Sequence, residues 1–227
     1  MIKRYHVEIL LALAALLLFA VVCRVEAPGE SARLSHAEVD AYLQRLADAP
    51  APAEEKAMLL ERLRVWGYAD DGRPVYMLNL MRFFDRLRPD GGLNGFSGTP
   101  AEANAYYERE VTPLVMRLGV TAAVAGNVQG VGAHSNIAGA ATVADDWNRV
   151  LVVRYPSRRA FFELVSHPDY WKLLPFKLAS VDLALVPVNG DVVMPDPRLL
   201  TGGLLLVLFL LTGWIRSARR RPETAAA

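Results

Sequence analysis

One polar residue interrupts an apolar stretch in the middle of the chain. Asn79 lies within VYMLNLMRF, residues 75–83. Asparagine is disfavoured in strands unless it makes a specific contact, and alternation along a strand would put Asn79 on one face with Met77 and Met81. Its amide could orient a ligand in a barrel pocket, or it could bond to neighbouring backbone as buried polar groups do.

Three charged or titratable residues are further candidates for chemistry. Arg154 ends a second apolar stretch, where it could hold an anionic ligand or pair with Asp182. His167 stands at a predicted helix break, where it could act as a base or ligand, or simply cap a helix. His134 lies in a polar loop that could close over a pocket, although a loop histidine without a partnered acid is usually solvated.

Motifs for several kinds of site are absent from the sequence. It has no paired histidines at metal-binding spacing, no nucleophile elbow and no phosphate-binding loop. The single cysteine, Cys23, excludes an intrachain disulfide and a cysteine-based metal site. We therefore predict no metal site and no cofactor. If haem binds, His134 or His167 would be its ligand.

The charge distribution argues against nucleic acid as a partner. Six of the 25 basic residues lie near the two ends, at 3–4 and 216–221, which leaves 19 basic against 22 acidic residues in the middle. Binding to nucleic acid needs clustered lysine and arginine, which this faintly acidic middle lacks.

Two capping boxes and several proline and glycine positions divide the middle of the chain into elements. Ser35 with Glu38 and Thr99 with Glu102 each predict a helix start. Helices are predicted at about 35–46, 53–66, 99–118 and 157–166, with a turn or two more at 169–180. Strands are predicted at 75–83, 120–131, 147–155 and 181–188, and a loop at 132–146. The order from residue 75 is β-α-β-β-α-β, an α+β ferredoxin-like plait that follows an N-terminal helical extension.

Both ends of the chain are hydrophobic. Residues 199–215 carry no charge over 17 residues, the lower limit for a membrane helix, and arginines follow them. Residues 9–23 are shorter and also fit a cleaved signal peptide, but Pro28 after Val25-Glu26-Ala27 disfavours cleavage. An uncleaved anchor is predicted. Basic residues beyond both spans predict that both termini are cytoplasmic and that the middle lies outside the inner membrane, in the periplasm.

The predicted organisation follows from these boundaries. It has a cytoplasmic N-terminus (1–6), a transmembrane helix or signal anchor (7–25), a linker (26–34), a helical extension (35–68), a folded domain (70–188), a linker (189–198), a transmembrane helix (199–215) and a basic cytoplasmic tail (216–227).

The middle of the chain resembles a known superfamily. The stretches VYMLNLMRF, YYEREVTPLVMRLG and WNRVLVVRYPSRRAFFELVSHPDY are similar to an uncharacterised family of dimeric α/β-barrel proteins, which are ferredoxin-like and resemble antibiotic-biosynthesis monooxygenases. The resemblance covers about residues 70–188. It implies a homodimer in which two plaits pair their sheets into a closed barrel. Relatives include cofactor-independent monooxygenases, haem-degrading enzymes, isomerases and domains without known activity, so the fold leaves the reaction open.

Three functional hypotheses remain open on the sequence alone, and they do not agree on whether the protein is an enzyme. The leading one is a membrane-anchored domain that binds a small apolar or amphipathic ligand, or a partner protein, outside the cytoplasm. Its pocket candidates are Asn79, Arg154, His167, Tyr76 and Tyr107. The alternatives are a cofactor-independent monooxygenase that uses Asn79, Arg154 and His167, and a haem-binding enzyme.

Overall fold

The chain forms two compact units. The computed structural model describes residues 6–26, 33–48, 53–88, 93, 95–130, 134–136, 145–191 and 197–219. One unit is the middle of the chain, Pro28–Gly190, and the other combines the two ends, Met1–Ala27 and Asp191–Ala227.

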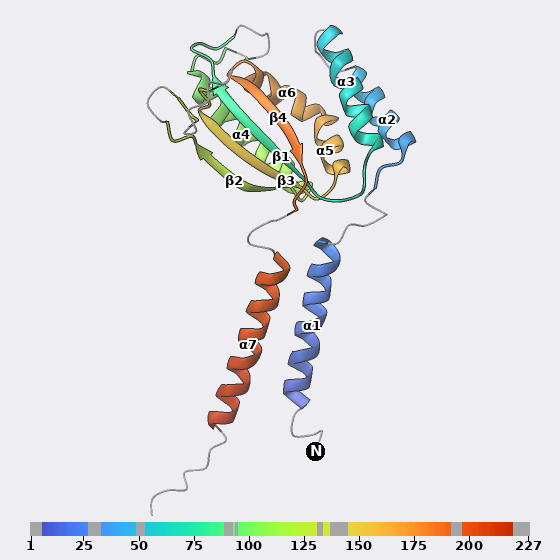
Figure 1. Ribbon diagram of the computed structural model, residues 1–227, viewed down its shortest axis with the longest axis vertical. Coiled ribbons are helices and arrows are strands. Elements are labelled where there is room, and N and C mark those ends of the chain that lie inside the picture. The colour runs from blue at the N-terminus through green and yellow to red at the C-terminus, as the bar shows by residue number, and fades with distance from the viewer. Residues whose placement is uncertain are drawn as a thin grey trace, which may run out of the picture. The chain divides into compact units, whose positions relative to one another are not determined.

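The middle unit is an α+β fold with one antiparallel sheet of four strands (Figure 1). Its elements, in chain order, are α2 (His36–Ala47), α3 (Ala53–Tyr68), β1 (Val75–Phe83), α4 (Pro100–Arg117), β2 (Thr121–Asn127), β3 (Arg149–Tyr155), α5 (Arg158–Val165), α6 (Pro168–Leu178) and β4 (Val181–Val188). The strands lie in the order β2-β3-β1-β4. Helices α4, α5 and α6 lie behind the sheet in Figure 1, on one of its two faces.

Strand β1 lies in the interior of the sheet and shows the alternation predicted from the sequence. Its side chains at Val75, Met77, Asn79 and Met81 are buried, and those between them are partly exposed. Asn79 therefore points to the face that the helices cover. It stands opposite Leu151 of β3 and Leu185 of β4, which places it in the middle of the sheet.

The two predicted helix starts are confirmed at the level of individual bonds. In α2 the Ser35 hydroxyl accepts from the Glu38 amide, and the Glu38 carboxylate accepts from the Ser35 amide at 2.9 Å. Thr99 and Glu102 make the same reciprocal pair at α4, with the Thr99 amide 2.7 Å from the carboxylate. Each pair satisfies amide groups that have no partner within the helix.

Three predicted boundaries differ from the structure. Strand β2 ends at Asn127 and β3 begins at Arg149, so both are shorter than predicted. The segment after His167 is a helix of 11 residues rather than a turn or two. His167 caps this helix and Pro168 occupies its first turn, a position that proline favours. Most of the loop predicted at 132–146 lies outside the described residues.

The helical extension is fastened to the rest of the middle unit by close packing and by one buried acid. A Cβ atom added to Gly67 of α3 would lie 2.9 Å from atoms of both Phe162 and Val39, so glycine lets the helix approach them. Asp70 is 1% exposed. Its carboxylate accepts the Leu34 amide at 2.7 Å and lies 3.5 Å from Nε of Arg158.

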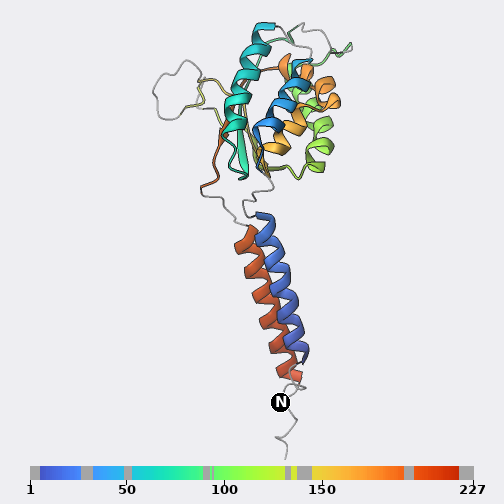
Figure 2. The same cartoon turned by 90° about the vertical axis from the view of Figure 1, so that its right-hand side faces the viewer.

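The unit formed by the ends contains α1 (His6–Glu26) and α7 (Pro197–Arg219), both long and apolar enough to cross a membrane. Figure 2 shows them side by side. Glu8 and Arg216 form an ion pair at 2.7 Å, and a Cβ added to Gly202 would lie 3.1 Å from the Phe19 ring. The two helices are therefore antiparallel. The residues predicted as linkers and as the tips of the two tails lie largely outside the described residues.

Candidate functional site

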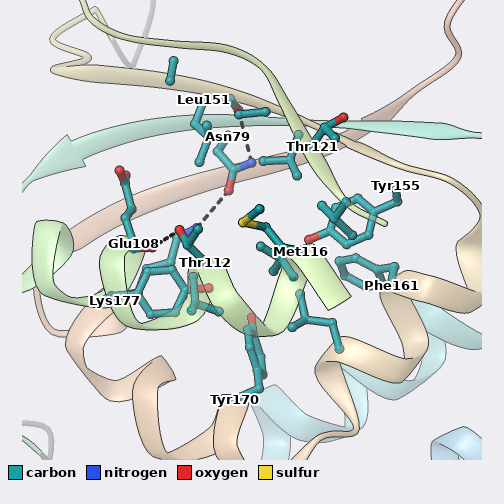
Figure 3. A pocket seen from close by; sticks show the side chains of 18 of the residues that line it. Asn79, Glu108, Thr112, Met116, Thr121, Leu151, Tyr155, Phe161, Tyr170 and Lys177 are labelled. Carbon is teal, nitrogen blue, oxygen red and sulfur yellow. Dashed lines mark hydrogen bonds between the residues drawn. The ribbon is translucent and has the colours of Figure 1, made fainter. Parts of the chain in front are cut away.

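A pocket of about 450 Å³ lies between the helix-covered face of the sheet and helices α4, α5 and α6 (Figure 3). This volume is within the usual range for sites that bind small molecules. Apolar side chains from strands and helices form most of its wall. Its polar members are Asn79, Glu108, Thr112, Thr121, Arg149 and Lys177, with three tyrosines, Tyr107, Tyr155 and Tyr170.

A lysine and an asparagine meet at the buried end of this pocket. Lys177 of α6 is 7% exposed and Asn79 is 4% exposed. The Lys177 ammonium Nζ donates to Oδ1 of Asn79 at 2.9 Å. Nδ2 of Asn79 donates to the backbone oxygens of Met77 and Leu151, at 3.1 and 3.2 Å. These two bonds fix the amide orientation, so that its oxygen faces the lysine (Figure 3).

Burial changes the acidity of this lysine. Loss of hydration lowers the pKa of Lys177 to about 8, against a smaller opposing effect from the charge of Glu108. The Tyr107 ring, with its centre 5.2 Å from Nζ, adds a cation–π contact. Among the described residues, no carboxylate lies within ion-pair distance of Lys177. The amine is consequently held by a neutral oxygen and an aromatic face rather than by an acid.

The acid that lines the pocket is engaged elsewhere. Glu108 of α4 accepts from Nε and Nη2 of Arg149, at 2.8 and 2.6 Å, in a two-bond arrangement. Nδ2 of Asn104 donates to the same carboxylate at 2.8 Å. The hydrogen bond to Glu108 raises the pKa of Arg149. This pair is about 22% exposed, so it forms a neutral wall of the pocket near the surface.

Three tyrosines lie around the interior of the pocket. Burial raises the pKa of Tyr107, Tyr155 and Tyr170 above the usual tyrosine value. All three are therefore neutral hydroxyls near neutral pH. They present polar atoms to the pocket without adding charge to it.

The pocket reaches the surface between α4 and the edge strand β2. Thr112 and Met116 of α4 are exposed lining residues, and Met116 is 67% exposed. Thr121, Ala122 and Ala125 of β2 are exposed on the opposite side of this opening. A ligand that enters here would pass apolar walls before it met Lys177.

Two of the five pocket candidates predicted from the sequence line the pocket, Asn79 and Tyr107. The pocket, however, lies on the helix side of the sheet and not inside a barrel. Tyr76 and Arg154 face each other across β1 and β3, on the other face of the sheet from Asn79. The strand register puts Asp182 opposite Arg82, six residues along β1 from Tyr76, and Asp182 pairs with Arg82 at 2.6 Å. The predicted pair of Arg154 with Asp182 is therefore wrong.

The two histidines also lie outside the pocket lining. Nδ1 of His167 accepts the Asp169 amide at 3.1 Å as the cap of α6, and its side chain is 41% exposed. Nδ1 of His134 lies 3.4 Å from Oδ2 of Asp145, and the His134 side chain is 68% exposed. Within the described part of the chain, the pocket wall therefore contains no histidine that could bind haem.

The sequence alone did not single out three residues of the pocket, Lys177, Glu108 and Arg149. A signal for Lys177 was present, because Tyr170 and Lys177 are seven residues apart and so share one stripe of a helix. That stripe is visible only once 168–178 is recognised as a continuous helix. Arg149 and Glu108 are distant in sequence and meet only because β3 lies next to α4.

Comparisons with known proteins give a structural likeness alone. No family model matches the chain, and no curated protein matches it in sequence. RPA0582, a protein of unknown function from Rhodopseudomonas palustris, is 28% identical over 61% of this chain and 93% of its own, with a TM-score of 0.47. Methylated RPA0582 is 26% identical over 64% of this chain and 96% of its own, with a TM-score of 0.49.

The depressed pKa of Lys177 predicts a pH-dependent stability. Its folded pKa of about 8 lies below the value of 10.5 for an unhindered lysine. Between these values the unfolded chain binds more protons, so the native state gains stability as pH rises through this window. Lys177→Met removes that gain. Between about pH 7 and 9.5, the unfolding free energy of wild type should rise by about 2 kcal/mol relative to that of the variant.

Unfolding of the full chain in detergent micelles, followed by circular dichroism across this pH range, measures the effect. Lys172→Met is the matched control, because Lys172 lies on the same helix with a side chain that is 74% exposed. Its stability profile should stay parallel to that of wild type. If the stability profile of Lys177→Met is also parallel to that of wild type, the prediction is contradicted.

Proposed function

We propose that the protein is a membrane-anchored binding domain that takes a small amphipathic ligand into the pocket between its sheet and helices. The observation that carries this proposal is the Lys177 amine, held by Asn79 at the buried end of a mainly apolar pocket. A cation buried without an acid partner is costly unless a ligand or a chemical role compensates for it.

The lining defines the chemistry of this ligand. Val111, Val115, Leu151 and Val153 offer apolar walls for a hydrocarbon or aromatic body. The amine of Lys177 offers hydrogen bonds and positive charge to the polar end. A carboxylate or another oxygen acceptor would suit this position, since a hydrogen bond that involves a charged group is the stronger kind.

The site geometry supports binding over the two enzymatic hypotheses from the sequence. Of the three residues that a monooxygenase would use, Asn79 lines the pocket, whereas Arg154 and His167 lie elsewhere. Haem would need His134 or His167, and neither lines the pocket.

Decanoate and decanol separate the role of the amine from that of the apolar wall. Both fill the pocket with the same hydrocarbon chain, but only decanoate carries a negative charge. Lys177→Met should weaken decanoate binding by about 10- to 100-fold, as expected for loss of a charged hydrogen bond. Decanol binding should change by less than about threefold. Calorimetric titration of the full chain in detergent measures both ligands.

Lys172→Met again serves as the control and should bind both ligands like wild type. Equal losses for decanoate and decanol would show that Lys177 supports the pocket without contacting the head group. No binding of either ligand to wild type would overturn the proposed function.

We further propose that residues 70–188 form a ferredoxin-like plait that dimerises through its open sheet face. The element order and the strand order β2-β3-β1-β4 support the plait. One row across this face consists of Val124, Val152, Leu78 and Val186, which are neighbours in the strand register. Val124 is 58% exposed and Val186 43% exposed, and a second sheet would cover such a row.

A charge in this row should prevent association. Val152→Glu places a carboxylate at the centre of the sheet face, where a partner sheet would leave it buried and unpaired. Val65→Glu is the control, since Val65 lies on α3 and is 64% exposed. Sedimentation of the full chain in density-matched detergent should give a dimer for wild type and Val65→Glu, and a monomer for Val152→Glu. A monomeric wild type would refute the homodimer.

For the ends of the chain we propose an inner-membrane hairpin with both termini in the cytoplasm and the middle unit in the periplasm. The antiparallel packing of α1 and α7 supports placing the two termini on one side. The arginines at 216–221 support the cytoplasmic side.

Enzyme fusions test this topology in intact bacterial cells. Alkaline phosphatase folds only outside the cytoplasm, so a fusion after residue 227 should be inactive and one after residue 190 should be active. The reverse pattern would invert the topology. Activity from both fusions would show that α7 does not cross the membrane.

A further inference from the structure

Lysine is rare in this chain. Its 25 basic residues comprise 21 arginines and four lysines, Lys3, Lys56, Lys172 and Lys177. Arginine stays protonated at any ordinary pH, whereas a buried lysine can lose its proton and become a nucleophile. The buried cation at the inner end of the pocket is a lysine, although the partly exposed cation on the pocket wall, Arg149, is an arginine.

Burial of Lys177 favours its neutral amine over the charged form. Oδ1 of Asn79 accepts one N–H, a bond that either an amine or an ammonium group can donate. Glu108, the acid on the facing helix α4, is bound by Arg149 through both of its oxygens. The other titratable groups facing the pocket, Tyr107, Tyr155 and Tyr170, are neutral. With its pKa near 8, a substantial share of Lys177 is unprotonated at about pH 7.5.

We propose that the pocket captures an apolar aldehyde or ketone by forming an imine between the ligand's carbonyl carbon and Nζ of Lys177. The proposal rests on the proposed binding function and names the chemical class of the ligand. The nitrogen lone pair attacks the carbonyl carbon to give a carbinolamine. The C–O bond then breaks, and the oxygen leaves as water with both amine protons, so that R₂C=O and H₂N–Lys yield R₂C=N–Lys and H₂O.

The pocket is shaped for this reaction in two respects. Its opening between α4 and β2 is lined by small or apolar side chains, including Met116 and Ala122, which would admit a hydrocarbon chain. Its inner end holds the amine in one position, because Asn79 is itself fixed by two backbone oxygens. A preorganised, water-poor environment favours attack and slows hydrolysis of the imine.

Reductive trapping tests the proposal on the full chain in detergent micelles. Decanal and sodium cyanoborohydride at about pH 7.5 convert any imine into a stable secondary amine, and peptide mass spectrometry then assigns the adduct to a lysine. Lys177 should carry at least about tenfold more adduct than Lys172 or Lys56 at early times, since burial lowers its pKa and the pocket holds the aldehyde beside its amine. Equal or lower labelling of Lys177 would overturn the proposal.

A pair of variants on α4 tests entry through the pocket without altering Lys177. Thr112→Trp fills the opening and should reduce labelling of Lys177 at least about fivefold while leaving Lys172 unaffected. Arg109→Trp is the control, because Arg109 is 69% exposed and does not line the pocket. Equal labelling of Lys177 in the two variants would overturn entry by this route.

Decanoate separates failure of this proposal from failure of the proposed function. If decanoate binds wild type but decanal is not trapped at Lys177, binding stands and imine formation is refuted. If neither ligand engages the pocket, both proposals are refuted.

Discussion

The pocket depends on a single buried contact, between the amine of Lys177 and the amide oxygen of Asn79. A lysine amine that is almost fully removed from water must find a hydrogen-bond acceptor inside the protein. Asn79 supplies it from the middle of β1, and this explains why a residue with poor strand propensity occupies an interior strand. The contact links β1 to α6 across the pocket. An apolar side chain cannot fill the space between them without leaving these polar atoms without hydrogen-bond partners.

The precision of this contact comes from backbone on both sides. Asn79 is fixed by carbonyl oxygens of Met77 and Leu151, so that pairing between β1 and β3 determines where its oxygen points. Lys177 is placed by the start of α6, because each residue added to or removed from a helix rotates the following side chains by about 100°. His167 caps this helix, and Nε1 of Trp171 donates to the Val165 oxygen at 2.7 Å, which ties its first turn to α5. A cap ten residues away thus determines that the lysine faces the pocket.

The sequence predicted the features that local chemistry determines. The capping boxes at Ser35 and Thr99 gave correct helix starts, and alternation in 75–83 correctly grouped Asn79 with Met77 and Met81 on one face of the strand. Features set by pairing between distant segments were not predictable in the same way. Arg154 could be matched with Asp182 on charge, but register puts Arg82 opposite Asp182 and Tyr76 opposite Arg154. Lys177 was overlooked because a histidine and a proline were interpreted as the interruption of a helix, whereas they begin one.

The two cations of the pocket show where the structure follows the usual rules of stability and where it departs from them. Arg149 is partly exposed and meets Glu108 in a two-bond pair, an arrangement that any folded protein would favour. Lys177 is buried, has a lowered pKa and has no acid partner among the described residues. Methionine there would fill similar space without the cost of burying a charge. Departures of this kind concentrate at functional sites, because packing alone gives no reason for them. The asymmetry between the two residues therefore supports the proposal that the ion pair stabilises the pocket wall and that Lys177 contacts the ligand.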